Sequence, residues 1–280
     1  MPESAVPVKG TRPEGAVTES DASKKVREMF TQIAPRYDLL NHLLSLQLDR
    51  VWRARAARLL HPILARSDAV VLDLCCGTGD LALALSYSAN ARIIGADFAH
   101  TMLVRAREKS AAQARSGEAT QAEPGNASTP APPRNAPAPG PLSFIEADAL
   151  CLPFADCSFD LVTTAFGFRN LANYEAGLRE IQRVLKPGGT VAIVEFSEPP
   201  DGLLGNLYRW YFRTVLPKIG GLISGDRAAY SYLPKSVARF FRPAELAALM
   251  THTGYQSVEF RAWTFGTVAL HIGNKLEGPS

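Results

Sequence analysis

The chain has 280 residues, which is enough for one large domain or two small ones. With 46% hydrophobic and 20% charged residues it has the composition of a globular protein. Its formal charge of +3, without a basic run, argues against nucleic-acid binding. Four cysteines without CxxC spacing exclude a disulfide framework and indicate a reduced, cytoplasmic protein with no metal site. No apolar run reaches the length of a transmembrane helix, and the first twenty residues lack the apolar core of a signal peptide.

Two segments are predicted to stay outside the folded core. Residues 1–22 are polar and contain proline, which is typical of a disordered tail. Residues 111–141 hold nine Ala and seven Pro but no Val, Ile, Leu, Met or aromatic residue. Burial there cannot offset the entropy of ordering the backbone. We therefore expect a single domain at 23–280, interrupted by a disordered surface insertion at about 111–141.

Strand and helix patterns alternate along the rest of the chain. Near the end, strand patterns at 257–263 and 267–272 are separated by three residues, a gap that allows a hairpin but no parallel crossover. This order predicts a doubly wound, Rossmann-like α/β sheet, mostly parallel with an antiparallel C-terminal strand, and an N-terminal helical cap. Further strands are expected at 69–74, 92–97, 142–148, 158–164 and 190–195, and helices at 80–88, 101–109 and 174–185.

A glycine loop follows the first predicted strand. Gly77 and Gly79 fit the GxGxxG/A pattern and Asp97 lies twenty residues on, which matches the dinucleotide-binding fingerprint. However, Asp73 and Asp80 bracket the loop and would repel a pyrophosphate. The same carboxylates would attract the ammonium and sulfonium of S-adenosylmethionine (AdoMet), while Asp97 binds the ribose. The alternative is that the two residues are only a strand end and a helix cap.

Other polar residues follow the neighbouring strands. Because ligands bind at the carboxyl ends of such sheets, we expect Asp148 and residues 164–168 to lie at the same edge as Asp73 and Asp97. Asp148 and Ala149 are placed to meet an adenine edge through a short polar side chain and a backbone amide. The alternative is a turn that ends the strand.

Several motifs resemble a known family. Residues 71–80 (VLDLCCGTGD), 152–160 and 183–189 resemble motifs of class I AdoMet-dependent methyltransferases. More restrictive motifs, between about residues 26 and 275, resemble the UbiE/MenG family of quinone C-methyltransferases. They are residues 37–45 with Trp52, 166–170 (FGFRN), 183–197 (RVLKPGGTVAIVEFS), 231–236 and 269–273.

The resemblance implies methylation of a ring carbon of a polyprenylated quinol. The acceptor is either demethylmenaquinol or the corresponding ubiquinol precursor, and the Cys–Cys pair before GTGD favours the menaquinone type. Two departures stand out: family members often have His where this chain has Asp49, and Ser where it has Ala165, which leaves Ala165 only a backbone contact with the cofactor. By motif position the AdoMet contacts fall on Thr78, Asp97, Asp148 and Ala149, with Gly77 and Gly79 forming the loop.

The acceptor must be made nucleophilic, because a free phenol has a pKa near 10. We expect Arg169 to stabilise the developing phenolate and Asn170 to orient the hydroxyl or a water. The alternatives are that Arg169 pairs with a neighbouring carboxylate and that Asn170 caps the next helix. Tyr232 is a further candidate for handling protons, and His271 is more simply a core residue.

A polyprenyl quinol resides in the bilayer, so the enzyme must reach it. Residues 203–223 mix aromatic and basic side chains and residues 39–52 are rich in Leu, which favours a hydrophobic mouth that touches the membrane surface. Ordinary core packing is the alternative. The expected location is cytoplasmic with peripheral contact at the inner membrane face, and a homodimer stays open.

Two other functions were weighed. An NAD-linked oxidoreductase is disfavoured by the carboxylates around the loop and by the absence of a Tyr with Lys four residues later. A non-catalytic AdoMet-binding scaffold is disfavoured by the presence of Arg169 and Asn170.

Overall fold

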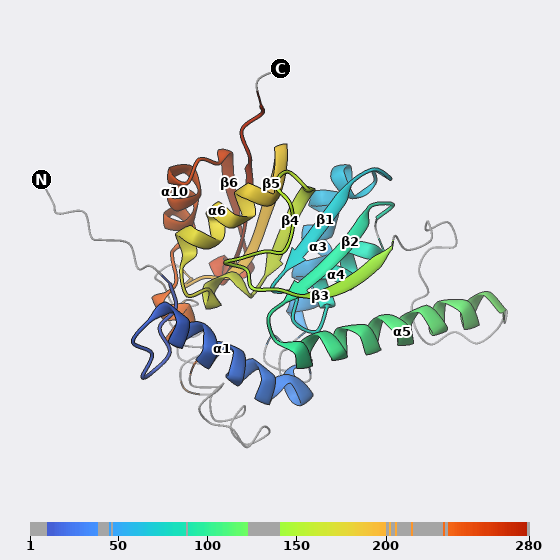
Figure 1. Ribbon diagram of the computed structural model, residues 1–280, viewed down its shortest axis with the longest axis horizontal. Coiled ribbons are helices and arrows are strands. Elements are labelled where there is room, and N and C mark those ends of the chain that lie inside the picture. The colour runs from blue at the N-terminus through green and yellow to red at the C-terminus, as the bar shows by residue number, and fades with distance from the viewer. Residues whose placement is uncertain are drawn as a thin grey trace, which may run out of the picture.

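The computed structural model describes residues 10–38, 45, 47–87, 89–122, 141–199, 202, 205, 214, 232 and 235–278. Its centre is a seven-stranded sheet in the order β3-β2-β1-β4-β5-β7-β6 (Figure 1). Strands β1 to β5 run parallel, and β7 is antiparallel to both β5 and β6. The predicted sheet, with its antiparallel C-terminal strand, is confirmed. The strands are β1 (Val70–Leu74), β2 (Arg92–Asp97), β3 (Leu142–Glu146), β4 (Phe159–Ala165), β5 (Leu185–Phe196), β6 (Gln256–Trp263) and β7 (Val268–Asn274).

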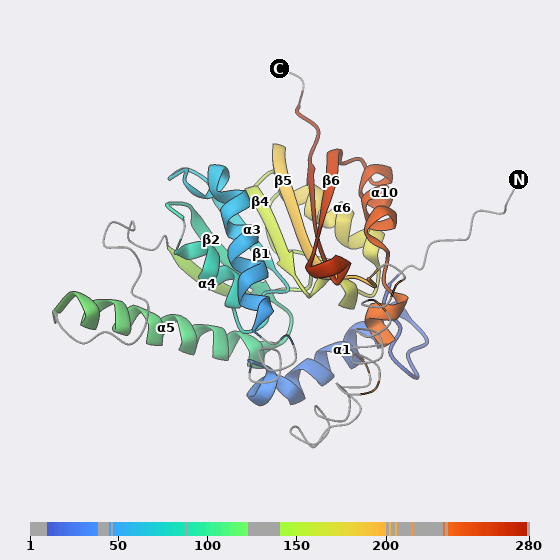
Figure 2. The same ribbon diagram turned by 180° about the vertical axis from the view of Figure 1, so that it is seen from behind.

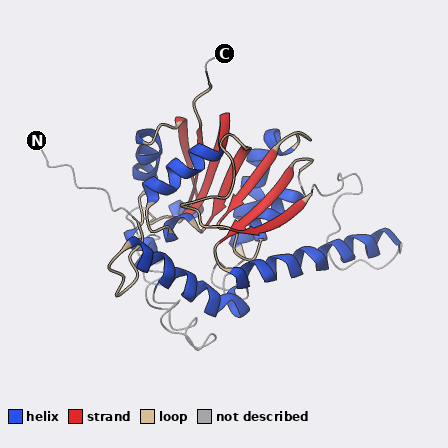
Figure 3. Ribbon diagram, viewed as in Figure 1, coloured by secondary structure: helices blue, strands red, loops and turns tan. Residues whose placement is uncertain are grey.

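Helices cover both faces of the sheet, as Figures 1 and 2 show from opposite sides. Helices α3 and α4 pack on one face, and α6 and α10 on the other. Helix α1 lies across one end of the sheet beside the start of α5 (Figure 3). The helices are α1 (Glu19–Ile33), α3 (Leu48–Leu64), α4 (Asp80–Ser86), α5 (His100–Ala122), α6 (Tyr174–Val184) and α10 (Pro243–His252), with short 3-10 turns η1 (Ala34–Arg36), η2 (Phe168–Asn170) and η4 (Thr264–Gly266).

The two cores explain why β1 is apolar along its length. Val71 packs with Leu60 of α3 and Leu85 of α4, whereas Leu72 packs with Leu178 of α6 on the opposite face. A parallel strand covered by helices on both sides is buried on both faces, so its sequence shows no alternation of polar and apolar residues.

Residues 10–22 belong to the fold, which corrects the expectation of a disordered tail reaching to residue 22. Thr11 is 7% exposed, and its backbone N–H donates to the Leu171 carbonyl at 2.8 Å. Thr18 then caps α1 in a reciprocal capping box with Asp21. The cap and the backbone contact order this polar segment without an apolar run of its own. Residues 1–9 lie outside the described residues.

The observed length of α5 also corrects the expected start of the disordered insertion. It continues to Ala122, so residues 111–122 are helical, and it extends well past the edge of the sheet (Figure 1). These residues are mainly Ala, Gln, Arg and Glu, which have high helix propensity. Extending a helix that has already formed needs no new nucleation. The proline-rich remainder, residues 123–140, lies outside the described part of the chain.

Strand boundaries differ from the expected ones at two places. β5 begins at Leu185, not at residue 190, because Leu185 already pairs with Phe159 of β4. The register then shifts, so that Thr190 pairs with Leu161 and the Lys-Pro-Gly-Gly stretch lies unpaired with β4 between them. β3 ends at Glu146, and Asp148 follows in an isolated bridge with Cys151. Within the described residues, no helix is both long and apolar enough to cross a bilayer.

Candidate active site

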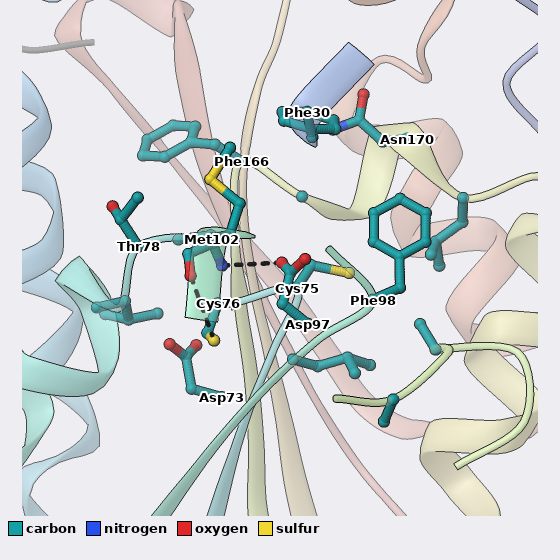
Figure 4. Close-up of a pocket in the computed structure, with 18 of the residues that line it drawn as sticks. Phe30, Asp73, Cys75, Cys76, Thr78, Asp97, Phe98, Met102, Phe166 and Asn170 are labelled. Atoms are coloured by element: carbon teal, nitrogen blue, oxygen red, sulfur yellow. Dashed lines mark hydrogen bonds between the residues drawn. The ribbon is translucent and has the colours of Figure 1, made fainter. Parts of the chain in front are cut away.

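A pocket lies at the carboxyl ends of β1, β2 and β4, with α1 and η1 beside it (Figure 4). It encloses about 980 Å³ of empty space, part of which is open to solvent. Of the residues expected from the sequence, its wall contains Asp73, Gly77, Thr78, Asp97, Asp148, Ala149, Ala165 and Asn170.

The glycine loop is shaped by two residues with positive φ. Gly77 has φ 55° and Gly79 has φ 82°, a region that side chains disfavour. A Cβ on Gly79 would also lie 3.0 Å from the Cβ of Ala106 and 3.1 Å from the Phe144 ring. Gly79 lies outside the described pocket wall, and its role is to turn the chain into α4.

Asp97 is fixed at the end of β2 by backbone donors. Its Oδ2 accepts from the Gly77 N–H and its Oδ1 from the Ala99 N–H, both at 2.9 Å (Figure 4 shows the first). Burial raises the pKa of the carboxyl to about 6, against the lowering effect of these hydrogen bonds. A carboxylate oxygen can accept more than one hydrogen bond, so Asp97 can still receive ribose hydroxyls from the pocket.

Asp73 has one unpaired carboxylate oxygen. Its Oδ1 accepts from the Thr163 hydroxyl at 2.9 Å, whereas the buried Oδ2 has no hydrogen-bond partner among the described residues. Burial raises the pKa of Asp73 to about 7. A buried acceptor without a donor is costly, and a cationic N–H donor in the pocket would satisfy it.

Asp80 is already neutralised within the protein. The Lys109 ammonium lies 2.6 Å from its Oδ1, and Arg53 Nη2 lies 3.3 Å from its Oδ2. Lys109 also donates to the Thr78 hydroxyl, which in turn donates to Asp38. The prediction that Asp73 and Asp80 together attract a cation is therefore wrong for Asp80. The attraction depends mainly on Asp73.

Arg169 is engaged by a carboxylate. Its Nη1 lies 2.7 Å from Glu195 Oε1, and its backbone N–H donates to Glu195 Oε2 at 3.1 Å. Both side chains are almost completely buried, and Arg169 is not among the described residues of the pocket wall. The expectation that Arg169 faces a phenolate is not supported, and the alternative of a carboxylate pair is confirmed.

Asn170 lines the pocket and does not cap α6. That cap is Asn173, whose side chain accepts from the Ala176 N–H at 3.0 Å. Asn170 Oδ1 instead accepts from the Tyr232 hydroxyl at 3.1 Å. The helix-capping alternative for Asn170 is therefore wrong.

Tyr232 connects Asn170 to the N-terminal segment. Its hydroxyl oxygen lies 2.8 Å from the Thr11 Oγ1. Burial raises the pKa of Tyr232 above its usual value, so the phenol stays protonated near neutral pH and acts as a hydrogen-bond donor. Sequence reasoning missed Thr11, because a lone Thr in a polar stretch carries no signal.

The N-terminal part of the chain supplies further wall residues that the sequence analysis did not assign to the site, namely Phe30, Tyr37, which begins one of the family motifs, and Arg53. Trp52, beside Arg53, is a core residue whose indole N–H donates to the Thr264 hydroxyl at 2.8 Å. Of the predicted hydrophobic mouth, residues 39–44 and 46 and nearly all of 203–223 lie outside the described residues.

His271 is a core residue, as expected. It is 2% exposed, and its Nε2 lies 2.9 Å from the Pro243 carbonyl oxygen. Cys75 and Cys76 line the pocket, and burial raises the pKa of both thiols. No group of three or more metal-ligating side chains gathers in the parts of the chain that the structure describes.

Solved structures with a similar fold include a methyltransferase and a cyclase. A SAM-dependent methyltransferase from Thermotoga maritima, described as a possible histamine N-methyltransferase, aligns over 89% of this chain and 99% of its own, with TM-score 0.58 and 17% identity. The [4+2]-cyclase SpnF aligns over 96% and 100%, with TM-score 0.61 and 16% identity. At such identities the likeness shows the fold alone.

Proteins of similar sequence identify the family more closely than the solved structures do. Demethylmenaquinone methyltransferase of Thermus thermophilus is 48% identical over 88% of this chain and 100% of its own length. The protein of the same name from Deinococcus radiodurans is 45% identical, over 92% and 95%. Ubiquinone/menaquinone biosynthesis C-methyltransferase UbiE of Geobacter sulfurreducens is 38% identical, over 91% and 90%. The model of the ubiE/COQ5 methyltransferase family matches residues 18–128 and 134–275, and this chain therefore belongs to that family.

Proposed function

We propose that the protein transfers a methyl group from AdoMet to a ring carbon of demethylmenaquinol, forming menaquinol. The relatives at 48% and 45% identity are named demethylmenaquinone methyltransferase, whereas the relative at 38% is named for both the ubiquinone and the menaquinone pathway. This difference favours the naphthoquinol over the benzoquinol acceptor.

The residues present fit AdoMet. Asp97 offers acceptors to ribose hydroxyls, Asp148 and Ala149 stand where the adenine edge would meet them, and the unpaired Oδ2 of Asp73 suits an ammonium donor. AdoMet supplies a methyl group already activated by its sulfonium. The protein's task is therefore to place the ring carbon in line with that methyl, which can be worth about 7–11 kcal/mol.

We assign the acceptor hydroxyl to Asn170 and Tyr232. Asn170 lines the pocket together with Phe30 and Leu171, and Tyr232, which is not among the described wall residues, donates a hydrogen bond to it. Asn170 orients the quinol hydroxyl, and the protonated Tyr232 fixes the Asn170 amide by donating to its oxygen. This favours the developing phenolate through neutral hydrogen-bonding groups. Arg169 is then a positioning residue, because its pair with Glu195 holds the turn from which Asn170 projects.

We also propose peripheral contact with the membrane. Support comes from the isoprenoid tail of such an acceptor and from the composition of residues 39–52 and 203–223. Co-sedimentation with anionic vesicles, reduced by Trp210→Ala, would support this contact, and absence of binding would contradict it.

The decisive observation for the reaction is that one pocket contains the Asp73–Asp97 cofactor wall and Asn170, whose side-chain oxygen accepts a hydrogen bond from Tyr232. The test supplies methyl-labelled AdoMet with reduced demethylmenaquinol or with a demethylated benzoquinol in detergent micelles. We expect label in the naphthoquinol ring and at least tenfold lower turnover in Asn170→Ala, whereas Asn90→Ala, an exposed control, keeps wild-type turnover. Label only in the benzoquinol would assign the other pathway, and label in neither would contradict the proposal.

A further inference from the structure

The wall of the pocket is strongly acidic. Asp73, Asp80, Asp97 and Asp148 all contribute to it, and among the described wall residues Arg53 is the one basic side chain. The amino-acid end of AdoMet carries an ammonium and a carboxylate. A carboxylate placed beside Asp73, Asp97 and Asp148 would be repelled unless a cation meets it. Arg53 is therefore the described wall residue whose charge can meet the AdoMet carboxylate.

Arg53 presents its guanidinium from α3. The residue is 8% exposed, and its contacts with Asp49 and Asp80 both end on one nitrogen, Nη2. A guanidinium has five N–H donors in a rigid fork. The Nε and Nη1 donors of Arg53 have no acceptor within hydrogen-bond distance among the described residues. Both two-donor edges of a guanidinium include Nη2, so the free Nε and Nη1 donors do not lie side by side. Each of them can still donate a single charge-assisted hydrogen bond to a carboxylate.

Asp49 fixes the position of the Arg53 guanidinium. It lies one helical turn before Arg53, is 3% exposed, and its other oxygen accepts from the Ser45 hydroxyl at 2.5 Å. A buried carboxylate anchored on both oxygens restricts the rotamer of the arginine that it pairs with. Arg53 is thus pre-organised before a ligand enters, which reduces the entropy lost on binding.

We propose that Arg53 binds the carboxylate of the amino-acid end of AdoMet, and that Asp49 positions Arg53 for this contact. The proposal rests on the assignment of AdoMet to this pocket. It explains how an acidic wall suited to a sulfonium and an ammonium also accepts the anionic part of the same molecule. It also gives α3, a helix that packs on the sheet, a part in recognising the cofactor.

The test compares two ligands that differ in this carboxylate. Calorimetry on the ligand-free protein measures the affinity of AdoMet and of decarboxylated AdoMet, which keeps the ammonium and the sulfonium. We expect wild type to prefer AdoMet by about 10- to 100-fold, the range of a charge-assisted contact. Arg53→Met removes this preference by weakening AdoMet alone. Arg58→Met, an exposed control on the same helix, leaves both affinities unchanged.

Two further variants keep the test decisive if Arg53→Met does not fold, which circular dichroism checks. Arg53→Lys keeps the charge but moves its N–H donors, and we expect it to retain only part of the preference. Asp49→Asn is expected to reduce the preference while the variant stays folded. A preference that survives every Arg53 substitution would overturn the inference, whereas a wild-type protein that binds neither ligand would refute the AdoMet assignment itself.

Discussion

At the level of single residues, the ionisation of Asp73 makes ligand binding in the pocket depend on pH. Burial raises the pKa of its carboxyl to about 7, so near neutrality the ligand-free protein holds a proton there part of the time. A cationic ligand binds the ionised form, and binding below pH 7 must therefore release that proton. We expect AdoMet affinity, measured by calorimetry, to fall about tenfold per pH unit from pH 7 to pH 6 and to level off above pH 8.

The raised pKa of Asp73 also predicts that the stability of the protein depends on pH. The unfolded carboxyl titrates near 3.8 and the folded one near 7, so the folded state binds more protons between these values. The free energy of unfolding of the ligand-free protein therefore contains a contribution from Asp73 that is lost as pH rises through this window. Asp73→Asn should flatten this part of the pH profile of thermal unfolding, and the exposed Asp68→Asn should not. An unchanged AdoMet affinity and an unchanged unfolding profile in Asp73→Asn would contradict the assignment.

Some of these residues could be predicted from the sequence, and others could not. Asp73, Asp97 and Asp148 each follow a recognisable strand, and the strand-end rule places them together. The ion pairs of Asp80 and Arg169 join residues 29 and 26 positions apart in the chain, and no local pattern reports such a pairing. Arg53 was missed because a basic residue in an amphipathic helix usually faces solvent.

At the level of elements, the Arg169–Glu195 pair joins η2 to the end of β5. Removing one partner leaves the other charge buried and unpaired, which typically costs about 3–5 kcal/mol. We expect Arg169→Met and Glu195→Met each to lower the free energy of unfolding in urea by this amount, and the double variant to lose less than either single one.

Turnover separates this pair's structural role from direct catalysis. If Arg169 acts by positioning Asn170, the double variant should fold stably and bind AdoMet, yet stay at least tenfold below wild type in turnover. A double variant with wild-type turnover would remove the pair from the mechanism. Additive destabilisation would contradict the pairing itself.

The N-terminal segment is a second element that reaches the acceptor side. Thr11 lies before residue 18, where the match to the family model begins, and its hydroxyl contacts Tyr232. Thr11→Val should lower turnover about two- to tenfold, the effect of one hydrogen bond, with AdoMet affinity unchanged. Thr18→Ala is the control, because it removes a helix cap worth about 1 kcal/mol and no contact with Tyr232. Equal turnover in both variants would contradict a positioning role for Thr11.

The limits of prediction at this level have physical causes. The strand patterns located all seven strands because burial on both faces leaves continuous apolar runs. Residues 10–22 were missed because their order comes from a capping box and from contact with a distant loop. A Cβ on Gly10 would lie 2.1 Å from the Ala172 backbone, an approach that composition does not reveal.

At the level of the whole molecule, strand order places the pocket. β1 and β4 are neighbours at the centre of the sheet, and the chain leaves them toward helices on opposite faces, α4 after β1 and α6 after β4. Such a switch point opens a crevice at the carboxyl ends of the two strands. Asp73 at the end of β1 and Ala165 at the end of β4 both line it. The alternation of strands and helices in the sequence was enough to predict that a pocket lies at the carboxyl ends of the strands, but not which side chains face it.

The central claim is that this crevice methylates a quinol, and the quinones of cells lacking the protein test it most directly. We predict that such cells accumulate demethylmenaquinone and lose menaquinone. The wild-type chain should restore menaquinone, and Asn170→Ala should restore at least tenfold less. Menaquinone at its normal level in cells without the protein would contradict the account.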